Sequence, residues 1–254
     1  MNKIDVAIVI PSCDKYNDIW PTLDHSISKF WPDLNLPIYL VTNYLECINP
    51  KIISIKIGED LSWSTNLINA LEKIPHKYIL LYIDDLILID YVNNKLFTED
   101  INYFGEINGN YLRFNPTPKG KKSSGIFDKI PKGHLYRSST IFSVWKKSIL
   151  LSVLKNGESA WDFEIKGSPR TNNFEEWFSR KKTLINYVNL VIKGKVDPRA
   201  LNKLKDAGIP YCSNRSALSE WELTARRLRE LRSSIYNLLP KKIAGFVRGL
   251  MKSS

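Results

Sequence analysis

The sequence predicts an α/β fold, with a mostly parallel sheet and helices on both of its faces. Short apolar runs rich in β-branched residues alternate with segments of helical periodicity, as in successive β-α-β units. The runs are almost continuously apolar, which is typical of strands buried on both faces. With 254 residues, 43% of them hydrophobic, the chain can bury a full core, and disorder throughout is excluded.

The first half of the chain predicts four strands with helices between them. The expected strands are residues 5–10, 37–42, 52–57 and 78–83, and the expected helices are residues 18–30 and 64–73. Ser62 or Ser64 is expected to cap the second helix, because a side-chain oxygen at its start accepts hydrogen bonds from the first amides. A sheet of this kind binds ligands beyond the carboxyl ends of its strands.

The second half continues as mixed α and β structure. Its expected elements are a helix at 93–104, strands at 111–114 and 134–139, helices at 144–155 and 174–182, and an extended segment at 185–192. A final helical region is expected from Ser219 onward, interrupted by Pro240. A long loop before residue 134 carries five lysines, namely Lys119, Lys121, Lys122, Lys129 and Lys132.

Composition narrows the class of protein. The longest apolar stretch, residues 78–89, is shorter than the roughly 18 to 20 residues that span a bilayer and is split by two aspartates, so an integral membrane protein is not expected. The N-terminus is interpreted as the first strand and not as a signal peptide. Three widely spaced cysteines, Cys13, Cys47 and Cys212, fit neither a disulfide framework nor a zinc site. A reducing cytoplasm is therefore the expected compartment.

The C-terminal tail holds much of the positive charge. From Trp221 to Ser254 there are eight basic residues and two acidic ones, so the tail supplies +6 of the formal net charge of +11. Its apolar residues recur at helical spacing, which predicts an amphipathic helix lying on an anionic membrane surface. Packing of that apolar face on the domain or on a second subunit is the alternative.

Polar residues follow three of the predicted strands at the point where each ends. Pro11, Ser12 and Asp14 follow the first, Thr42 and Asn43 the second, and Asp84 and Asp85 the fourth. Because the carboxyl ends of parallel strands share one edge of the sheet, these side chains are expected to converge on one crevice.

The two adjacent carboxylates, Asp84 and Asp85, suggest a metal site. Like charges at the mouth of a low-dielectric sheet resist ionising together unless a divalent cation lies between them. A diphosphate would complete the coordination shell of such a cation. The alternative is an ordinary turn that uses aspartate for its local hydrogen bonds.

Several segments, in this order, resemble the glycosyltransferases of the GT-A fold, which is Rossmann-like, and more narrowly the bacterial enzymes that build lipopolysaccharide or capsule. The resembling segments are residues 9–14, 62–67, 80–85, 136–139 with 145–147, and 158–164 with 167–168. The resemblance covers about residues 4–209. It implies transfer of a sugar from a nucleotide-diphosphate sugar, with a UDP-sugar as the expected donor, to a saccharide or lipid-linked acceptor.

In that family an Asp-x-Asp motif binds the metal, and this chain departs from it. The motif here is Ile83-Asp84-Asp85, without the acidic residue two places before Asp85. Asp85 is the first choice as direct ligand of Mn²⁺ or Mg²⁺, whereas Asp84 binds the metal through water or binds sugar hydroxyls. The resemblance implies His134 as a third ligand, and an exposed strand-edge role is its alternative.

The resemblance also implies which residues hold the donor and the acceptor. The expected donor-binding residues are Pro11, Ser12, Asp14, Thr42, Asn43, Trp63, Ser64, Asn66, Asp84 and Arg137. The lysine-rich loop, Arg137 and Arg170 are candidate partners of the diphosphate, because fixed cations share its charge. Trp161 is expected to stack on an acceptor sugar. Glu164 and Asp162, then Glu158, are the candidates for the general base; a helix start capped by Glu158 or Asp162 is the alternative.

The predicted layout is a GT-A domain at residues 1–218 and a basic helical tail at 219–254. Within the domain, residues 1–90 form the nucleotide-binding half and 91–218 the acceptor half. The expected location is the cytoplasm, peripherally at the inner face of the membrane. Two other functions stay open: a nucleic-acid-binding or scaffold protein that uses the basic tail, and a sugar nucleotidyltransferase. The latter needs a glycine-rich loop after the first strand, and residues 11–15 contain no glycine.

Overall fold

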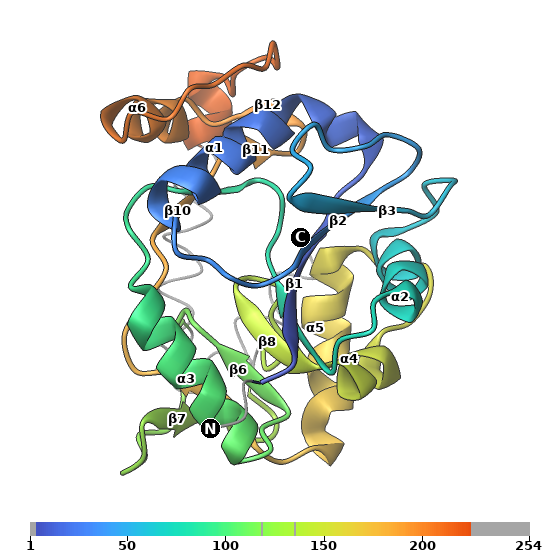
Figure 1. The fold of residues 1–254 in the computed structure, drawn as a ribbon, viewed down its shortest axis with the longest axis vertical. Helices are drawn as coiled ribbons and strands as arrows, with labels where there is room; N and C mark the ends of the chain where they lie inside the picture. The colour runs from blue at the N-terminus through green and yellow to red at the C-terminus, as the bar shows by residue number, and fades with distance from the viewer. Residues whose placement is uncertain (1–3, 118, 135, 225–254) are drawn as a thin grey trace, which may run out of the picture. The chain divides into compact units, whose positions relative to one another are not determined.

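A computed structural model of the chain describes residues 4–117, 119–134 and 136–224 (Figure 1). The chain divides into two compact units, a larger one made of residues 1–190 and 199–214 and a smaller one made of residues 191–198 and 215–254. The predicted division at residue 218 stays a prediction.

The larger unit is built on an eight-stranded sheet with the strand order β3-β2-β1-β4-β8-β6-β9-β7. Its strands are β1 (Val6–Pro11), β2 (Ile38–Thr42), β3 (Ile52–Lys56), β4 (Tyr78–Leu81), β6 (Tyr111–Arg113), β7 (Phe127–Lys129), β8 (Ser143–Lys146) and β9 (Trp177–Arg180). β1 to β4 are parallel, β6 and β9 run parallel to each other, and β8 and β7 are antiparallel to their neighbours. The predicted mostly parallel α/β sheet is confirmed.

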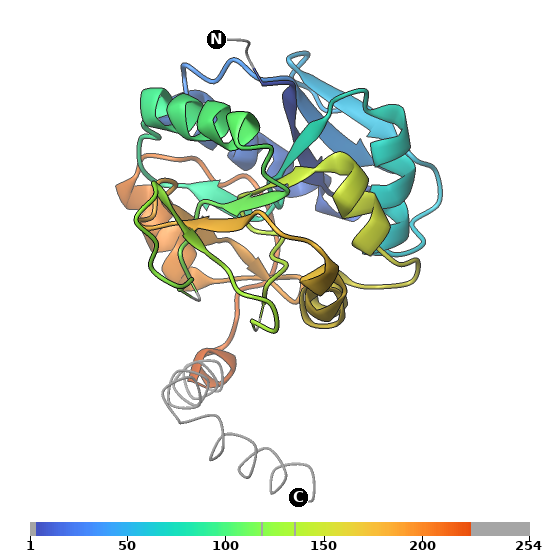
Figure 2. The same cartoon turned by 90° about the horizontal axis from the view of Figure 1, so that it is seen from below.

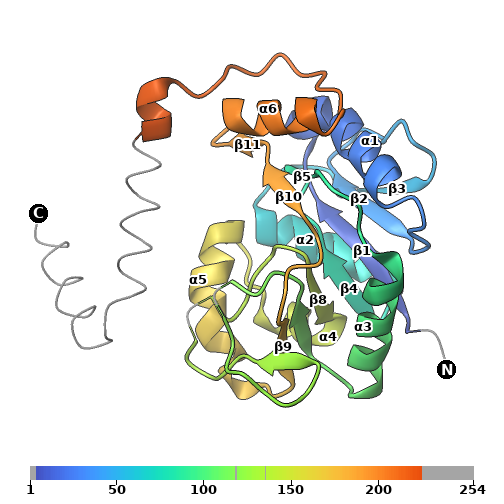
Figure 3. The same cartoon turned by 90° about the vertical axis from the view of Figure 1, so that its left-hand side faces the viewer.

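Helices cover both faces of this sheet, as Figures 2 and 3 show. They are α1 (Trp20–Phe30) after a 3₁₀-helix at Asp14–Ile19, α2 (Trp63–Lys73), α3 (Asn94–Glu106), α4 (Lys147–Val153), α5 (Ala160–Arg170) followed by a 3₁₀-helix at Thr171–Asn173, and α6 (Pro198–Asp206). α2, α4 and α5 pack on the face that carries Val9, Leu81 and Trp145. On the opposite face, Trp31 and Phe104 make ring contacts that join α1 and β4 to α3.

Two short sheets complete the described residues. β5 (Leu86–Leu88) pairs antiparallel with β10 (Tyr187–Asn189), which brings the segment after Asp85 against a late part of the chain. In the smaller unit, β11 (Val191–Ile192) and β12 (Lys195–Val196) form a hairpin. There Lys195 forms an ion pair of 2.8 Å with Glu222.

The helix starts follow from local chemistry. The Ser62 side chain accepts from the Thr65 amide at the start of α2, and Asn93 does the same for α3 by accepting from Leu96. The helix start that was the alternative interpretation near residue 158 is present, as the start of α5. Its cap is Ser159, with Asp162 completing a capping box, rather than Glu158 or Asp162 as cap.

Three predicted elements are wrong. Residue 134 and residues 136–139 form no strand, residues 143–146 form strand β8 ahead of the short α4, and the segment predicted as a helix at 174–182 contains strand β9. β8 pairs with β4 and β6 in the middle of the sheet, and β9 pairs with β6 and β7. These pairings bury side chains such as Trp145 and Trp177, and that gain overrides local helix preference.

The predicted tail at 219–254 lies outside the described residues from residue 225 onward. The choice between a membrane surface and a packed helix therefore stays a prediction. Within the described residues, no helix combines the length and the apolar character that crossing a bilayer requires. Cys13, Cys47 and Cys212 are all free thiols.

Candidate functional site

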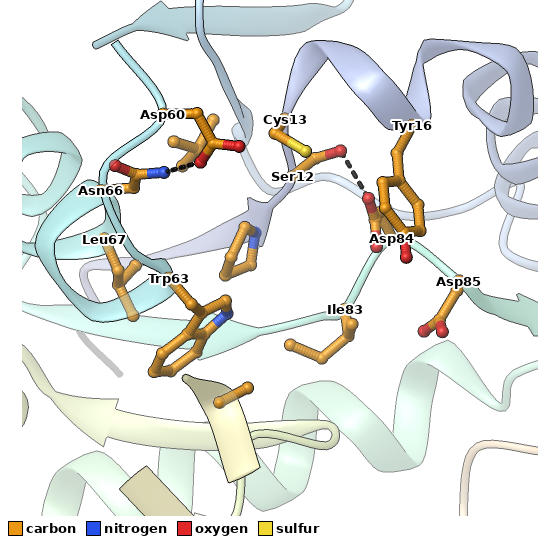
Figure 4. Close-up of a pocket in the computed structure, with 13 residues that line it drawn as sticks. Ser12, Cys13, Tyr16, Asp60, Trp63, Asn66, Leu67, Ile83, Asp84 and Asp85 are labelled. Carbon is orange, nitrogen blue, oxygen red and sulfur yellow. Dashed lines mark hydrogen bonds between the residues drawn. The ribbon is translucent and has the colours of Figure 1, made fainter. Parts of the chain in front are cut away.

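A cavity of about 260 Å³ opens where β1 and β4 end and α2 begins (Figure 4). Six of the residues predicted to bind the donor or the metal line it: Pro11, Ser12, Trp63, Asn66, Asp84 and Asp85. The expected convergence of the first and fourth strand ends is therefore present, and the start of α2 closes the third side.

Asp84 is held firmly in the wall of the cavity. Its side chain is buried, with 6% of the residue exposed, and its Oδ2 accepts a hydrogen bond of 2.5 Å from the Ser12 hydroxyl. The Trp20 indole N–H donates in turn to the Ser12 oxygen at 2.9 Å. This chain of donors fixes the carboxylate of Asp84 against the end of β1.

Asp85 points elsewhere. Figure 4 shows its carboxylate directed away from Ser12, while that of Asp84 is directed toward it. The Asp85 carbonyl accepts from the Leu190 amide at 2.8 Å, which ties the backbone here to the end of β10. The two neighbouring carboxylates thus have separate surroundings, and Asp85 is the more accessible of the two.

A third carboxylate, Asp60, also lines the cavity, and the sequence analysis missed it. Its Oδ1 accepts from the Asn66 amide group at 2.8 Å, and its Oδ2 lies 3.7 Å from the Lys15 ammonium. The available signal was its place in the loop just before α2. Among the described residues that line the cavity there are three carboxylates and no basic side chain. Lys15 is the cation that forms an ion pair with one of these carboxylates, Asp60.

The remaining walls are apolar or aromatic. Val41, Leu67 and Ile83 lie beside Trp63, whose buried indole N–H has no hydrogen-bond partner within the described part of the chain. Most buried donors in proteins are paired with protein atoms or ordered water, so this N–H is open to a water molecule or a ligand. Burial raises the pKa of the Cys13 thiol, so this lining residue stays neutral near pH 7.

Three other residues predicted to bind the nucleotide-sugar donor form hydrogen bonds next to the cavity without lining it. Asp14 accepts from the amides of Asn43 (2.9 Å) and Tyr44 (3.0 Å), and Asn43 accepts from the Asp14 amide at 3.0 Å. The Thr42 hydroxyl donates to the Leu45 carbonyl at 2.8 Å. These bonds join the ends of β1 and β2, and none of Asp14, Thr42 and Asn43 is among the cavity-lining residues.

Ser64 and Glu158 bind each other through two hydrogen bonds. The Glu158 amide donates to the Ser64 hydroxyl at 2.9 Å, and the Ser64 amide donates to the Glu158 carbonyl at 3.0 Å. The Glu158 carboxylate is bidentate with Arg170, at 2.8 and 2.6 Å. A predicted base and a predicted diphosphate partner thus neutralise each other.

Asp162 and Glu164 occupy different environments on α5. Hydrogen bonds from Lys166 and Ser159 lower the pKa of Asp162 to about 2, which makes it a weak base. Glu164 Oε1 accepts from the Ser139 hydroxyl and from the amide and hydroxyl of Thr140, at 3.1, 2.7 and 3.0 Å. Glu164 lies one helical turn beyond Ala160, which lines the cavity.

Trp161 lies on the surface beside the cavity-lining Ala160, with 63% of the residue exposed. Its ring centroid is 6.1 Å from that of Tyr136, at an angle of 59°. The two rings therefore border one accessible aromatic patch.

The geometry does not fit the roles predicted for Arg137 and His134. Arg137 is 1% exposed and donates to the carbonyls of Ile130, Thr171 and Phe174, and burial lowers its pKa to about 10. Such a guanidinium is a cross-link inside the protein. His134 Nε2 lies 3.1 Å from the Lys119 carbonyl oxygen and is absent from the cavity lining.

Asp84 and Asp85 are neighbouring carboxylates at the cavity. No group of three or more His, Cys, Asp or Glu side chains is placed to hold a metal among the described residues. Asp84 and Asp85 offer carboxylate oxygens, and Mg²⁺ is commonly held by one or two carboxylates with water and phosphate oxygens as its other ligands.

No protein-family model matches the chain, and no curated protein sequence matches it. Among solved structures, residues 1–349 of TarS from S. aureus in complex with UDP give a TM-score of 0.49 at 11% identity, over 72% of this chain and 60% of that one. HddC from Yersinia pseudotuberculosis complexed with GMP-PN gives 0.45 at 15% identity, over 80% and 97%. This chain thus covers less than two thirds of the TarS fragment.

Proposed function

We propose that the chain transfers a sugar from a nucleotide-diphosphate sugar to a saccharide or lipid-linked acceptor. The observation that carries the proposal is the cavity at the carboxyl ends of β1 and β4, with Asp84 fixed by Ser12 and Asp85 directed away from it. This edge of a parallel sheet is where nucleotide ligands bind.

The charge of the cavity selects its occupant. Three carboxylates without a lining cation repel a bare diphosphate, but they attract a diphosphate that arrives with a divalent ion. Asp85, with Asp84 beside it, would hold Mn²⁺ or Mg²⁺. A cation held by these carboxylates would supply Lewis-acid stabilisation of the charge on the departing diphosphate.

The chain's own residues supply binding and orientation. Pro11, Leu67 and Trp63 offer an apolar slot for a base, and the free indole N–H of Trp63 offers a hydrogen bond to the donor. Lys15, released from Asp60, reaches toward the phosphates. Glu164 accepts the proton of the acceptor hydroxyl, since Glu158 is paired and the pKa of Asp162 is too low.

The proposal also specifies the nucleotide, the acceptor-binding surface and the pathway. UDP is the proposed nucleotide, Trp161 and Tyr136 the proposed platform for an acceptor sugar, and bacterial surface polysaccharide the proposed pathway, in lipopolysaccharide or capsule. The proposed location of the transfer reaction is the inner face of the cytoplasmic membrane, to which the protein attaches peripherally.

The test is calorimetric titration of UDP, GDP and CMP into the full chain, with and without Mn²⁺. The same titrations are made with Asp85→Ala and with Asp206→Asn, a matched control at an exposed carboxylate on α6. The proposal expects one nucleotide to bind with a strong dependence on Mn²⁺. Asp85→Ala should weaken that binding at least tenfold, and Asp206→Asn should leave it within twofold.

Two outcomes would overturn the proposal. One is the absence of binding for every nucleotide under both conditions, which would favour a nucleic-acid-binding or scaffold protein. The other is binding that ignores both Mn²⁺ and the Asp85 substitution. Once a donor is known, Glu164→Gln should lower kcat at least 100-fold while Asp162→Asn lowers it less than threefold; equal effects would remove Glu164 as the base.

A further inference from the structure

A hairpin at the far edge of the sheet from β3 carries lysines that the proposed function does not use. Lys121 and Lys129 form an antiparallel bridge, with amide-to-carbonyl distances of 2.8 and 3.2 Å, and β7 continues the pairing onto β9. The turn lies at residues 123–126. A Cβ at Gly120 would stand 2.7 Å from the Lys129 carbonyl oxygen, so glycine permits this close approach. Residues 119–129 are called the lysine hairpin below.

The charge on the lysine hairpin and its neighbour β9 is mostly positive, with Asp128 as the one carboxylate of the hairpin. The exposed lysines of this patch are Lys119, Lys121, Lys122, Lys129, Lys181 and Lys182. None of the six makes an ion pair with a carboxylate in the described part of the chain. The nearby carboxylates have other partners than these lysines: Asp128 accepts from the Ser123 amide of the hairpin at 3.2 Å, Asp100 pairs with Arg180, and Glu175 pairs with Lys132.

This arrangement costs stability in the absence of a partner. Lys121 and Lys129 stand directly opposite each other across the ladder, where like charges repel. Lys181 is also held beside the hairpin, because its ammonium donates to the Ser123 carbonyl at 2.8 Å. An anionic partner would relieve the repulsion, so the charge pattern indicates what the surface binds.

The turn adds an apolar contact. Ile126 is 55% exposed at the turn, while the next residue, Phe127, is buried against Phe178 and Tyr103. An aliphatic side chain surrounded by lysines suits the boundary between headgroups and acyl chains, where apolar and cationic groups are both favoured.

The strand directions place the turn on the same edge of the sheet as the cavity. β9 runs parallel to β6, which through the antiparallel β8 has the direction of β4. β7 runs antiparallel to β9. The residues before Phe127 therefore lie at the edge where β9 ends. β7 is four strand spacings from β4 in the sheet, or about 19 Å.

We propose that the lysine hairpin, with Lys181 and Lys182, binds an anionic lipid surface and inserts Ile126 at its boundary. Attachment there would turn the carboxyl edge of the sheet, and with it the cavity, toward the bilayer. The inference does not depend on the identity of the nucleotide or on the C-terminal tail.

The test is co-sedimentation of the full chain with vesicles of phosphatidylcholine alone or with about 30% phosphatidylglycerol. The variant Lys121→Glu, Lys122→Glu, Lys129→Glu is compared with Lys51→Glu, Lys95→Glu, Lys155→Glu, which changes the net charge equally at exposed lysines elsewhere. We expect the hairpin variant to bind anionic vesicles at least tenfold more weakly than the control variant. Neutral vesicles should bind neither.

A second variant, Ile126→Ser, separates a lipid surface from other polyanions. It should weaken vesicle binding about threefold or more and leave binding to heparin or duplex DNA within 1.5-fold. Equal vesicle binding by the two triple variants would overturn the proposal, as would loss of DNA or heparin binding with vesicle binding intact. Nucleotide titration and circular dichroism of each variant establish that it folds, so the outcome is separate from that of the proposed function.

Discussion

Asp84 and Asp85 are adjacent aspartates that differ in burial. The Ser12 hydroxyl donates to Asp84 in the wall of the cavity, whereas Asp85 is the more exposed of the two and its backbone carbonyl accepts from the Leu190 amide. Asp84 is therefore suited to fix geometry, and Asp85 lies closer to solvent. The two arginines predicted to bind the diphosphate have partners inside the protein instead: Arg137 donates to the Phe174 carbonyl, and Arg170 pairs with Glu158.

Lys15 is the residue-scale candidate for contact with phosphate. It is 81% exposed on its side chain, and its ion pair with Asp60 at 3.7 Å is of the weak, exposed kind that exchanges partners easily. We expect Lys15→Ala to weaken UDP binding about fivefold and to leave uridine binding unchanged, because only the former carries phosphate. Calorimetry measures both; Lys51→Ala is the control, and equal losses for the two ligands would contradict the assignment.

Asp5 gives the fold a dependence on pH. Partial burial works to raise its pKa, but hydrogen bonds from His76 and the Lys77 amide outweigh burial and leave the pKa below the ordinary 3.8. A lowered pKa stabilises the folded state above the unfolded value, and the gain is lost as pH falls through the folded pKa.

The corresponding prediction compares urea midpoints of the unmodified chain and Asp5→Asn between pH 5 and pH 3. The advantage of the unmodified chain should be present at pH 5 and shrink steadily below about pH 4. Asp206→Asn should show no such trend. An advantage that stays constant over this range would mean that Asp5 does not titrate as its contacts require.

At the scale of elements, hydrogen bonds join the start of α2 to the segment just before α5. Ser64 and Glu158 exchange two hydrogen bonds, and the Gly157 amide donates to the hydroxyls of Ser62 and Thr65 at 3.2 Å. The ring of Trp63 lies 5.6 Å from that of Phe163. One wall of the cavity therefore depends on two helices that are far apart in sequence.

Ser64→Ala should destabilise the fold by about 1–3 kcal/mol. Ser64 is fully buried, and its loss leaves the buried Glu158 amide without an acceptor. Urea unfolding measures the change, and Ser148→Ala, an exposed serine on α4, should stay within about 0.5 kcal/mol. An effect as small as that of the control would show that the two helix starts are not coupled through this bond.

At the scale of the whole molecule, buried guanidinium groups hold the second half of the chain together. Arg137 joins the carbonyls of Ile130, Thr171 and Phe174 and lies 4.5 Å from the ring centroid of Trp177. Arg180 pairs with Asp100 and links β9 to α3. Both bind segments that are distant in sequence, so their loss affects the entire fold.

Arg137→Met should lower the free energy of unfolding by about 3 kcal/mol, because it strands several buried carbonyls. Arg137→Lys should recover little of this, since a single ammonium cannot reproduce the planar fork of donors. Chemical denaturation measures both, with the exposed Lys95→Met as control. A loss below about 1 kcal/mol for Arg137→Met would refute the role of cross-link.

The sequence by itself determined the α/β class, the strands and helices of the first half, a serine cap at residue 62 or 64, and the meeting of Ser12 with Asp84 at one edge. Each of these follows from local periodicity and from the direction of parallel strands. Only the tertiary structure decided that residues 143–146 and 177–180 are strands, that Arg137 and Arg170 face internal partners, and that Asp60 joins the cavity. These outcomes depend on pairings between distant segments, whose burial energy outweighs local preference and leaves no trace in local sequence.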